Sequence, residues 1–541
     1  MSYIHYDLTP TKFFDPGSSG TSDGSGTITN PFYTNAQINT WVASLTGAMA
    51  GQVLGFKRGT KFRGYIAPVA STNYVYGTAA SPYFIVPYGN ALAAPIITSS
   101  LLYTDWARYT GYTNVWVKTG FASEPSIFDT DSWNRNWKVT GADLAAKLAA
   151  LVAAGAGFGF YDSGSYYIIP LSSTPNDGYH EVMRADNYAL NVTAKNVADT
   201  GYIVVSGIET RGGVNCGLVV DCSAATIAAS NVYILGNRVF FGGENKSGSS
   251  FGRNGIFING PSDSVRLTAS MVAENLIDFA ENNTFEYQNT NGLICENNRG
   301  YNCHLGNAIA ESWQSNSNAK VRYNIGAGRY GKPGDSENSN GVWINSRGLA
   351  GATLPASNTG NEVYYNLMYD MVGPLQNGGA NTLFYHNTCV GIESVATGAN
   401  TPNVCETAGS SWDVRNNLFI SAVTHGSAFS FRTVTGTLTA SAANHFMRDS
   451  FRNYDAGTTY TSLATWNAQA FQGGLDSQFS TYAARAAVFD AGYKPVAGSV
   501  LLNAGEVIAG YQTRDLVGNA IAGVPTIGCY QLLPSIPRIT I

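Results

Sequence analysis

The feature that most constrains this chain is a four-residue phrase that returns seven times between about residues 231 and 419. Each copy has an aliphatic residue or Phe, then two variable residues, then Asn. The copies end at Asn237, Asn275, Asn297, Asn324, Asn366, Asn387 and Asn417, so by subtraction the intervals are 38, 22, 27, 42, 21 and 30 residues. A minimum interval near 21 residues with additions of variable size is typical of a solenoid whose coils carry loops.

The residues around each of these asparagines predict strands rather than helices. They form short β-branched or aromatic runs bounded by Gly, Asn and Ser. An Asn tolerates the left-handed conformation of a turn, and its amide can bond to the same Asn in the coils above and below. We therefore expect an all-β chain of stacked coils with an asparagine ladder at one corner.

Composition and charge exclude several classes of protein. Only 12% of the 541 residues are charged and the formal net charge is -5, so we expect no binding to nucleic acid. Seven Cys without a CxxC pair and six scattered His predict no disulfide framework, no metal site and no cofactor. The N-terminus has no basic segment followed by an apolar run, and no apolar stretch reaches about 18 residues. We therefore expect neither a secretion signal nor membrane insertion.

The organisation that we expect has five parts, in residues 1–45, 46–94, 95–185, 186–420 and 421–541. The first is an N-terminal segment with a short helix that caps the first coil, and the second contains the first coils. The third is a small β-rich insertion that contains a helix beginning after Asp143, with Leu144, Leu148, Leu151 and Val152 on one face. The fourth is the central stack of coils, and the fifth contains the last coils and a closing segment.

Both ends of the chain resemble a known family. The run from Asp23 to Phe32 (DGSGTITNPF), the run from Gly51 to Gly64, and closing phrases such as Ile527 to Gln531 are similar to right-handed parallel β-helix proteins that act on polysaccharides, of the pectate-lyase-like superfamily. With no secretion signal, the chain most resembles a bacteriophage tailspike. That resemblance implies a homotrimer in the virion tail, attached directly or through an adaptor protein, which depolymerises capsule or lipopolysaccharide O-antigen on the host surface.

Acidic residues on one flank of the central coils are the candidates for catalysis. If Ile256, Phe285, Ile309 and Val342 point inward, then Phe257, Glu286, Ala310 and Trp343 form an outward column, and Glu311 lies one position off it. The direction of Glu311 then depends on a bulge that the sequence leaves open. We predict Glu286 with Glu311 as the catalytic pair, followed by Asp335 and Glu337. Sugar-binding residues are predicted at Trp313, Tyr330, Trp343, Arg347 and Glu406.

A pair of carboxylates suits glycosidic hydrolysis, in which one group donates a proton and the other attacks or activates water. Carboxylates one coil apart, at about 5 Å, suit retention of configuration, and those two coils apart suit inversion. A lyase is the alternative chemistry, for which His304, Arg329, Tyr330 and Lys332 are available as bases, although they form no lyase motif. The same fold and composition also suit a bacterial polysaccharide lyase or hydrolase, and a receptor-binding spike without catalysis.

Overall fold

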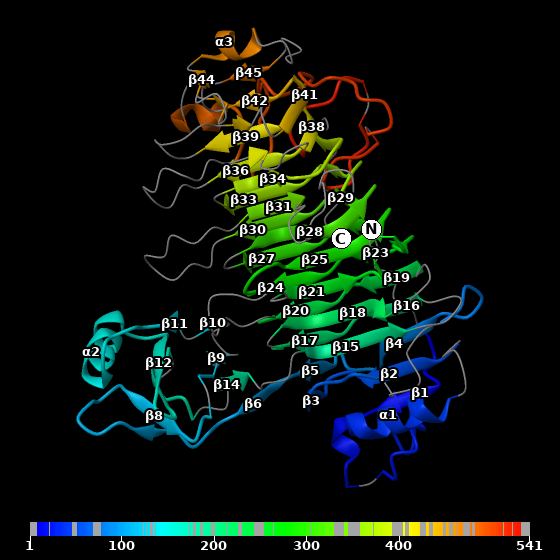
Figure 1. Ribbon diagram of the computed structural model, residues 1–541, viewed down its shortest axis with the longest axis vertical. Helices are drawn as coiled ribbons and strands as arrows, with labels where there is room; N and C mark the ends of the chain where they lie inside the picture. The colour runs from blue at the N-terminus through cyan, green and yellow to red at the C-terminus, as the bar shows by residue number, and fades with distance from the viewer. Residues whose placement is uncertain are drawn as a thin grey trace.

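A computed structural model shows the fold (Figure 1). It describes residues 8–20, 22–45, 51–68, 77–122, 124–125, 127–129, 134–135, 137–171, 174–176, 180–183, 188–195, 201–213, 215–224, 230–242, 254–262, 264–303, 306–328, 340–344, 358–371, 373–391, 404–405, 410–421, 429–431, 436–446, 451–453, 458–460, 462–468, 476–478, 482–511, 513–521 and 523–531. Strands contain far more of these residues than helices do, and the two largest sheets are built from parallel pairs, which confirms the mainly β class.

The parallel strands form three ladders, in which each strand pairs with the equivalent strand of the next coil. The first ladder contains β1 (Lys12–Phe14), β2 (Val53–Lys57), β4 (Tyr83–Tyr88), β16 (Gly201–Ser206), β19 (Ser230–Leu235), β23 (Met271–Ala273), β26 (Ile294–Glu296), β29 (Lys320–Arg322), β32 (Glu362–Tyr364), β35 (Thr382–Tyr385), β38 (Ser410–Arg415) and β41 (Gly436–Ala442). A short strand, β22 (Leu267–Thr268), precedes β23.

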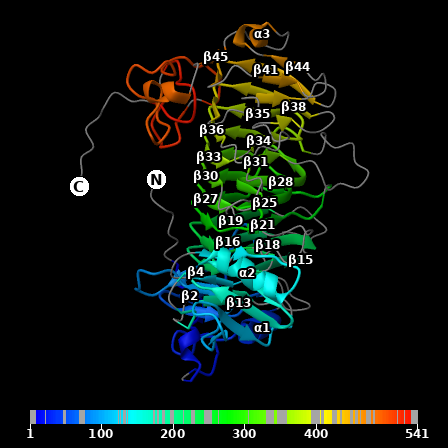
Figure 2. The same cartoon turned by 90° about the vertical axis from the view of Figure 1, so that its left-hand side faces the viewer.

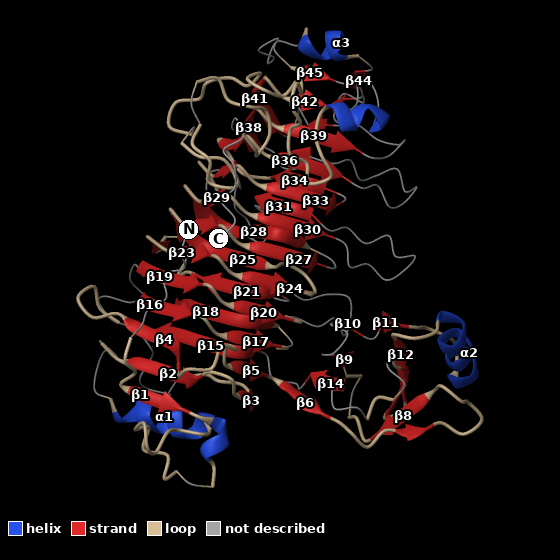
Figure 3. Ribbon diagram, turned by 180° about the vertical axis from the view of Figure 1, so that it is seen from behind, coloured by secondary structure: helices blue, strands red, loops and turns tan. Residues whose placement is uncertain are grey.

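The second ladder contains β15 (Tyr188–Lys195), β18 (Cys216–Ala224), β21 (Asn254–Asn259), β25 (Phe285–Asn291), β28 (Asn307–Ser317), β31 (Asn340–Ile344), β34 (Gly373–Asn377) and β37 (Val404–Cys405). The third contains β3 (Lys61–Arg63), β5 (Ile96–Thr98), β17 (Glu209–Arg211), β20 (Arg238–Phe240), β24 (Leu276–Asp278), β27 (Arg299–Cys303), β30 (Ile325–Gly328), β33 (Leu367–Met371), β36 (Thr388–Gly391), β39 (Leu418–Ser421), β42 (His445–Phe446) and β45 (Ser477–Gln478). Figures 1 and 3 show the ladders from opposite sides.

Inward-facing side chains stack in columns along the axis. The column behind the first ladder consists of Ile234, Val272, Cys295, Val321, Val363, Phe384 and Val414, which pair in register and are all buried. Most of these are the apolar residues that open the repeated phrase. The phrase returns because every coil must present an apolar residue to its neighbours at this place.

The asparagine ladder is present, with one correction to the prediction. Its members are Asn237, Asn275, Asn298, Asn324, Asn366, Asn387, Asn417 and Asn444, and each donates its side-chain amide to the Oδ1 atom of the next, at 2.9 to 3.1 Å. The prediction of Asn297 was therefore wrong by one residue, and the ladder extends past residue 419.

Each ladder asparagine bonds to the coils on both sides. In Asn324, for example, Oδ1 accepts both the backbone N–H and the side-chain amide of Asn298, and Nδ2 donates to the backbone carbonyl of Cys295 and to Asn366. The residue before such an Asn has the positive φ, as in Tyr323 at 57° and Tyr365 at 55°. The prediction that the Asn itself adopts the left-handed turn was therefore wrong, because the ladder needs its amide at the position after the turn.

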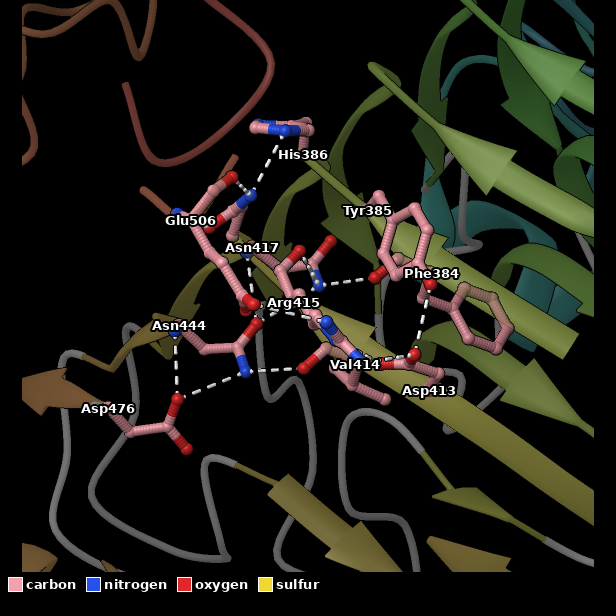
Figure 4. A network of polar contacts seen from close by, with 11 residues as sticks. Phe384, Tyr385, His386, Asp413, Val414, Arg415, Asn417, Asn444, Asp476 and Glu506 are labelled. Atoms are coloured by element: carbon pink, nitrogen blue, oxygen red, sulfur yellow. Dashed lines mark hydrogen bonds and ion pairs between the residues drawn. The ribbon is translucent and has the colours of Figure 1, made fainter. Parts of the chain in front are cut away.

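The ladder ends at a carboxylate (Figure 4). Asn444 donates its backbone and side-chain N–H groups to Oδ1 of Asp476, at 2.8 and 3.2 Å, and the indole N–H of Trp466 donates to Oδ2. An ionised carboxylate accepts hydrogen bonds and donates none, so it needs no further acceptor in a following coil. Asp476 therefore closes the ladder.

Other elements cover the ends and one flank of the stack. Helix α1 (Asn35–Ser44), which begins with a capping box of Thr34 and Gln37, buries Ile38 and Trp41 against the first coils. After β45, the chain forms a 3₁₀ helix (Tyr482–Ala487) and then lies along the outer surface as a segment of turns. This closing segment (residues 488–531) is visible beside the ladders in Figure 2.

Near Asp476, the structure also has α3 (Leu463–Asn467) and a sheet of β40 (Phe429–Phe431), β43 (Phe451–Asn453) and β44 (Thr458–Tyr460). None of the described helices is long and apolar enough to cross a membrane.

The closing segment is fixed to the coils by polar and aromatic contacts, some of which Figure 4 shows. The carboxylate of Glu506 accepts from Arg415, and its backbone N–H donates to Asn416. The ring of Tyr511 packs edge-on against Tyr364 and Tyr385 of the coils, with 5.5 and 5.2 Å between ring centroids.

Between β5 and β15 the chain leaves the ladders and builds two small sheets. One contains β6 (Ser100–Leu102), β9 (Ile127–Asp129), β10 (Asn134–Arg135) and β14 (His180–Met183). The other contains β7 (Ala107–Arg108), β8 (Trp116–Thr119), β11 (Trp137–Lys138), β12 (Phe158–Asp162) and β13 (Ser165–Ile169), next to α2 (Leu144–Ala154). Leu148 and Leu151 of α2 are buried, whereas Val152 is 45% exposed, so the predicted apolar face was too wide.

The corrected ladder predicts different effects for two neighbouring asparagines. Asn298→Ala removes a buried amide and leaves donors of Asn275 unsatisfied, so we expect the free energy of unfolding to fall by about 3 kcal/mol. Asn297→Gly keeps the left-handed conformation and the ladder, so we expect a change within about 1 kcal/mol. Urea unfolding of both variants measures this difference, and equal losses would contradict the assignment.

Candidate active site

Two predicted carboxylates lie side by side on the second ladder. Glu286 of β25 and Glu311 of β28 are partners in parallel register, on adjacent coils. Phe285 and Tyr287, which flank Glu286, point into the core, so the alternation of a strand turns Glu286 to the outer face. Adjacent strands are about 4.8 Å apart, which fixes the two residues at the spacing of one coil.

A bulge in β28 gives Glu311 its outward direction. Strand β28 has one more residue than β31 between the pairs Asn307↔Asn340 and Ala310↔Val342. Ala308, Ile309 and Ala310 are all buried in the core, and Glu311 takes the outward position beside Glu286. Ala310 was predicted to point outward, and that prediction was wrong because the bulge adds a residue before it.

Two glycines of the third ladder make room for this bulge. A Cβ atom on Gly300 would lie 1.8 Å from the backbone oxygen of Ala308, and one on Gly326 would lie 2.4 Å from Cγ1 of Ile309. Neither distance is possible for a side chain, so these positions require glycine. The direction of Glu311 therefore depends on residues in another strand of the coil.

A second row of asparagines holds the two carboxylates. Asn283 donates one amide to both groups, with 3.0 Å from its Nδ2 to Oε2 of Glu286 and 2.5 Å to Oε2 of Glu311. The two oxygens are therefore no further apart than the sum of these distances, about 5.5 Å. Asn254 donates to Glu286 at 2.8 Å and Asn307 to Glu311 at 3.5 Å.

This second row differs from the first in where its amides point. Asn283 accepts the backbone and side-chain N–H groups of Asn307, at 2.9 and 2.8 Å, so the donors come from the following coil, which reverses the direction of the first ladder. In addition, Nδ2 of Asn254 and Nδ2 of Asn283 are directed at carboxylates instead of the next asparagine. The Oδ1 atom of Asn307 is buried and accepts no hydrogen bond from the described residues.

Burial disfavours the charged form of Glu286. Glu286 and Glu311 are each 4% exposed, and desolvation raises the pKa of Glu286 above its ordinary value of 4.5, against the hydrogen bonds from Gln288, Asn254 and Asn283 that lower it. A third carboxylate, Glu281, is 1% exposed. Burial raises the pKa of the Cys303 thiol, and the charges of Glu281 and Glu311 raise it further, so both of these carboxylates lie near Cys303.

The other predicted site residues are placed only in part. Half-buried Trp313 lies two residues after Glu311 and pairs in register with Gln288. Trp343 pairs with Glu311 in register through the backbone of β31. Tyr330, Asp335, Glu337, Arg347 and Glu406 lie outside the described residues. The lyase candidates His304, Arg329 and Lys332 also lie outside them.

Sequence reasoning missed the asparagines that hold the pair, as well as Glu281. A signal for the asparagines was present, because Asn254, Asn283, Asn307 and Asn340 each lie two residues before an apolar residue of the second ladder. Within the described part of the chain, no group of three or more His, Cys, Asp or Glu could hold a metal ion. Six cysteines, Cys216, Cys222, Cys295, Cys303, Cys389 and Cys529, are buried thiols.

Comparisons with known proteins identify the fold and not the family. No family model and no curated protein matches the sequence. The solved structure described as a complex of XylC with xylose is 11% identical, with a TM-score of 0.51, and the alignment covers 96% of this chain and 98% of that one. A structure named glycoside hydrolase is 10% identical, with a TM-score of 0.46, covering 82% and 94%. An alginate lyase from Paenibacillus sp. str. FPU-7 is 9% identical, with a TM-score of 0.33, covering 74% and 92%. The likeness to XylC shows a shared fold.

The raised pKa of Glu286 predicts a pH dependence of stability. The folded chain binds this proton more tightly than the unfolded chain, so the contribution is favourable below the unfolded pKa, near 4.5, and is lost as the pH rises through the folded pKa. Glutamine does not titrate, so Glu286→Gln removes the loss of stability that comes from ionising a buried carboxyl group. We expect the stability of the variant relative to the wild type to increase as the pH rises from about 4 toward neutral.

Urea unfolding across this range measures the effect, with Glu124→Gln in the insertion as the control. Glu124 forms an ion pair with Lys138 near the surface, far along the chain from the site. Parallel stability curves for the wild type and Glu286→Gln would contradict the raised pKa.

Proposed function

We propose that this protein is a polysaccharide-degrading enzyme that hydrolyses a glycosidic bond with Glu286 and Glu311, on the flank of a closed, right-handed parallel β-helix. The observation that carries the proposal is that one amide, of Asn283, holds both carboxylates. Their separation of at most about 5.5 Å is shorter than the roughly 6.5 to 9.5 Å of glycosidases that invert configuration, which favours retention. The shared fold with a xylose-bound protein makes a carbohydrate the first ligand class to test.

The two carboxylates have different roles in this proposal. Glu286, whose burial raises its pKa, is the general acid that protonates the oxygen of the leaving group. Glu311 is the nucleophile, held by the amides of Asn283 and Asn307 and attacking the anomeric carbon. The ionised Glu286 then removes a proton from water, which releases the sugar from Glu311 and restores the acid.

Hydrolysis is favoured over elimination by the residues around the pair. A lyase needs a base near the α-proton of a uronic acid and a cation that neutralises its carboxylate. The described groups that donate to Glu286 and Glu311 include four side-chain amides, of Asn254, Asn283, Gln288 and Asn307, and an amide serves neither purpose. We retain Asp335 and Glu337 as further candidates, with Trp313, Tyr330, Trp343, Arg347 and Glu406 as sugar-binding residues.

The roles predict the effect of removing either carboxylate. Glu286→Gln and Glu311→Gln should each lower the rate of polysaccharide cleavage by about 10³-fold or more, whereas Glu124→Gln should leave it unchanged. The products should show the mass of added water, no absorbance from an unsaturated sugar, and, by NMR, the anomeric configuration of the substrate. Full activity in both variants would refute the proposal, as would unsaturated products.

The biological setting that we propose is a bacteriophage tailspike that recognises and degrades capsule or lipopolysaccharide O-antigen on the host surface. The support is the resemblance of both chain ends to β-helix proteins that act on polysaccharides, together with the low share of charged residues, 12%. Such a spike is a homotrimer, so sedimentation equilibrium should give three times the chain mass of 57.5 kDa. A mass of one chain at micromolar concentration would contradict this assembly.

A further inference from the structure

A long groove lies on another side of the coils from Glu286 and Glu311. Its volume is about 1180 Å³, and it follows the turn between the first and third ladders, whereas the carboxylates face outward from the second. Its lining includes the corresponding turn of successive coils, through Arg58, Leu92, Gly207, Gly236, Glu274, Asn297 and Tyr323. These seven residues come from seven successive coils, and the six spacings of about 4.8 Å between the coils give the groove a length of roughly 29 Å. This length fits an extended oligomer rather than a small metabolite.

Four arginines line the groove. They are Arg58, Arg238, Arg299 and Arg514, the last from the closing segment. None of them forms an ion pair among the residues that the structure describes. Four guanidinium groups without an ion-pair partner among the described residues are unexpected on a chain of net charge -5. Together they create a local electrostatic field that attracts anions.

The acidic residues of the lining do not cancel this charge. Asp515 is 1% exposed, and its carboxylate accepts hydrogen bonds from Val517, Asn519 and Gln531 within the closing segment. Glu274 is half-buried and is the other carboxylate of the lining. The groove therefore has more positive than negative charge available to a ligand.

Charged and apolar residues alternate along the third ladder. Arg238, Leu276, Arg299 and Ile325 occupy the same register position in four successive coils. The two arginines are exposed and stand about 10 Å apart, with an apolar side chain between them. Tyr301 and Tyr323 add aromatic surface to the lining. This pattern suits a polymer that carries an anion on alternate units and an apolar sugar face between them.

We propose that this groove binds an extended acidic polysaccharide with carboxylates on alternate sugars, at a site separate from the catalytic carboxylates. Guanidinium groups bind carboxylates through two parallel hydrogen bonds, and tyrosine rings pack on sugar faces. That the ligand is a carbohydrate rests on the proposed function, whereas its acidity and extended form follow from the groove. A polymer held here raises the concentration of its free segments near Glu286 and Glu311.

The test measures binding of the full chain to two acidic oligosaccharides by calorimetry, with neutral xylo-oligosaccharides of equal length for comparison. Hyaluronate oligosaccharides carry a carboxylate on alternate sugars, and polygalacturonate oligosaccharides carry one on every sugar. Arg238→Ala/Arg299→Ala should weaken binding of at least one acidic oligosaccharide by about tenfold or more, and added salt should weaken binding to the wild type. The control Lys138→Ala/Arg485→Ala removes the same charge elsewhere and should change affinity by less than about twofold. Both groove arginines are exposed, so the thermal midpoint should not change.

Three results would overturn the proposal. They are wild-type affinity in the double arginine variant, equal binding of neutral and acidic oligosaccharides, and binding of single-stranded DNA as tight as that of the acidic sugars. Glu286→Gln and Glu311→Gln should bind acidic oligosaccharides like the wild type, because they do not line the groove. Retained cleavage in those variants would therefore refute the catalytic proposal and leave the groove proposal standing.

Discussion

The side-chain amide of a buried asparagine is the interaction on which this structure depends. Each coil turns a corner through one residue of positive φ, and the Asn that follows bonds to the coils on both sides. A coil alone buries too little apolar surface to be stable, so neighbouring coils must stay in register. The amide sets that register, because it satisfies its donors and acceptor only when the next Asn lies directly beside it.

The same device, slightly altered, produces the candidate active site. The second row lies at another corner of the coils, where the strands of the second ladder begin. There, Asn254 and Asn283 direct their Nδ2 groups at Glu286 and Glu311. Two carboxylates one coil apart would otherwise repel each other in a region of low dielectric constant. The amides reduce this cost, and the raised pKa of Glu286 reduces it further because a protonated group carries no charge.

The sequence predicted the repeated unit and the adjacent coils of the two glutamates, because interval and alternation are properties of the chain itself. It misplaced one ladder member, because Asn297 and Asn298 are consecutive and the motif does not say which has the left-handed turn. The sequence alone could not predict that the side chain of Glu311 points outward. That direction depends on a bulge which Gly300 and Gly326, in other strands, make possible. Arg514 reaches the groove from far along the chain, so no local pattern reveals it.

The closure of the ladder by Asp476 has an electrostatic consequence. From Asn237 to Asn444 every side-chain amide has the same orientation, with its oxygen toward the N-terminal coils and its NH₂ group toward the C-terminal ones. Aligned amides add their dipoles, as the peptide groups of an α-helix do. The positive end of this row meets the carboxylate of Asp476, and the negative end accepts the backbone N–H of Ile208. The stack of coils therefore contains a macrodipole with a charged group at its positive end, although no helix runs along its axis in the described part of the chain.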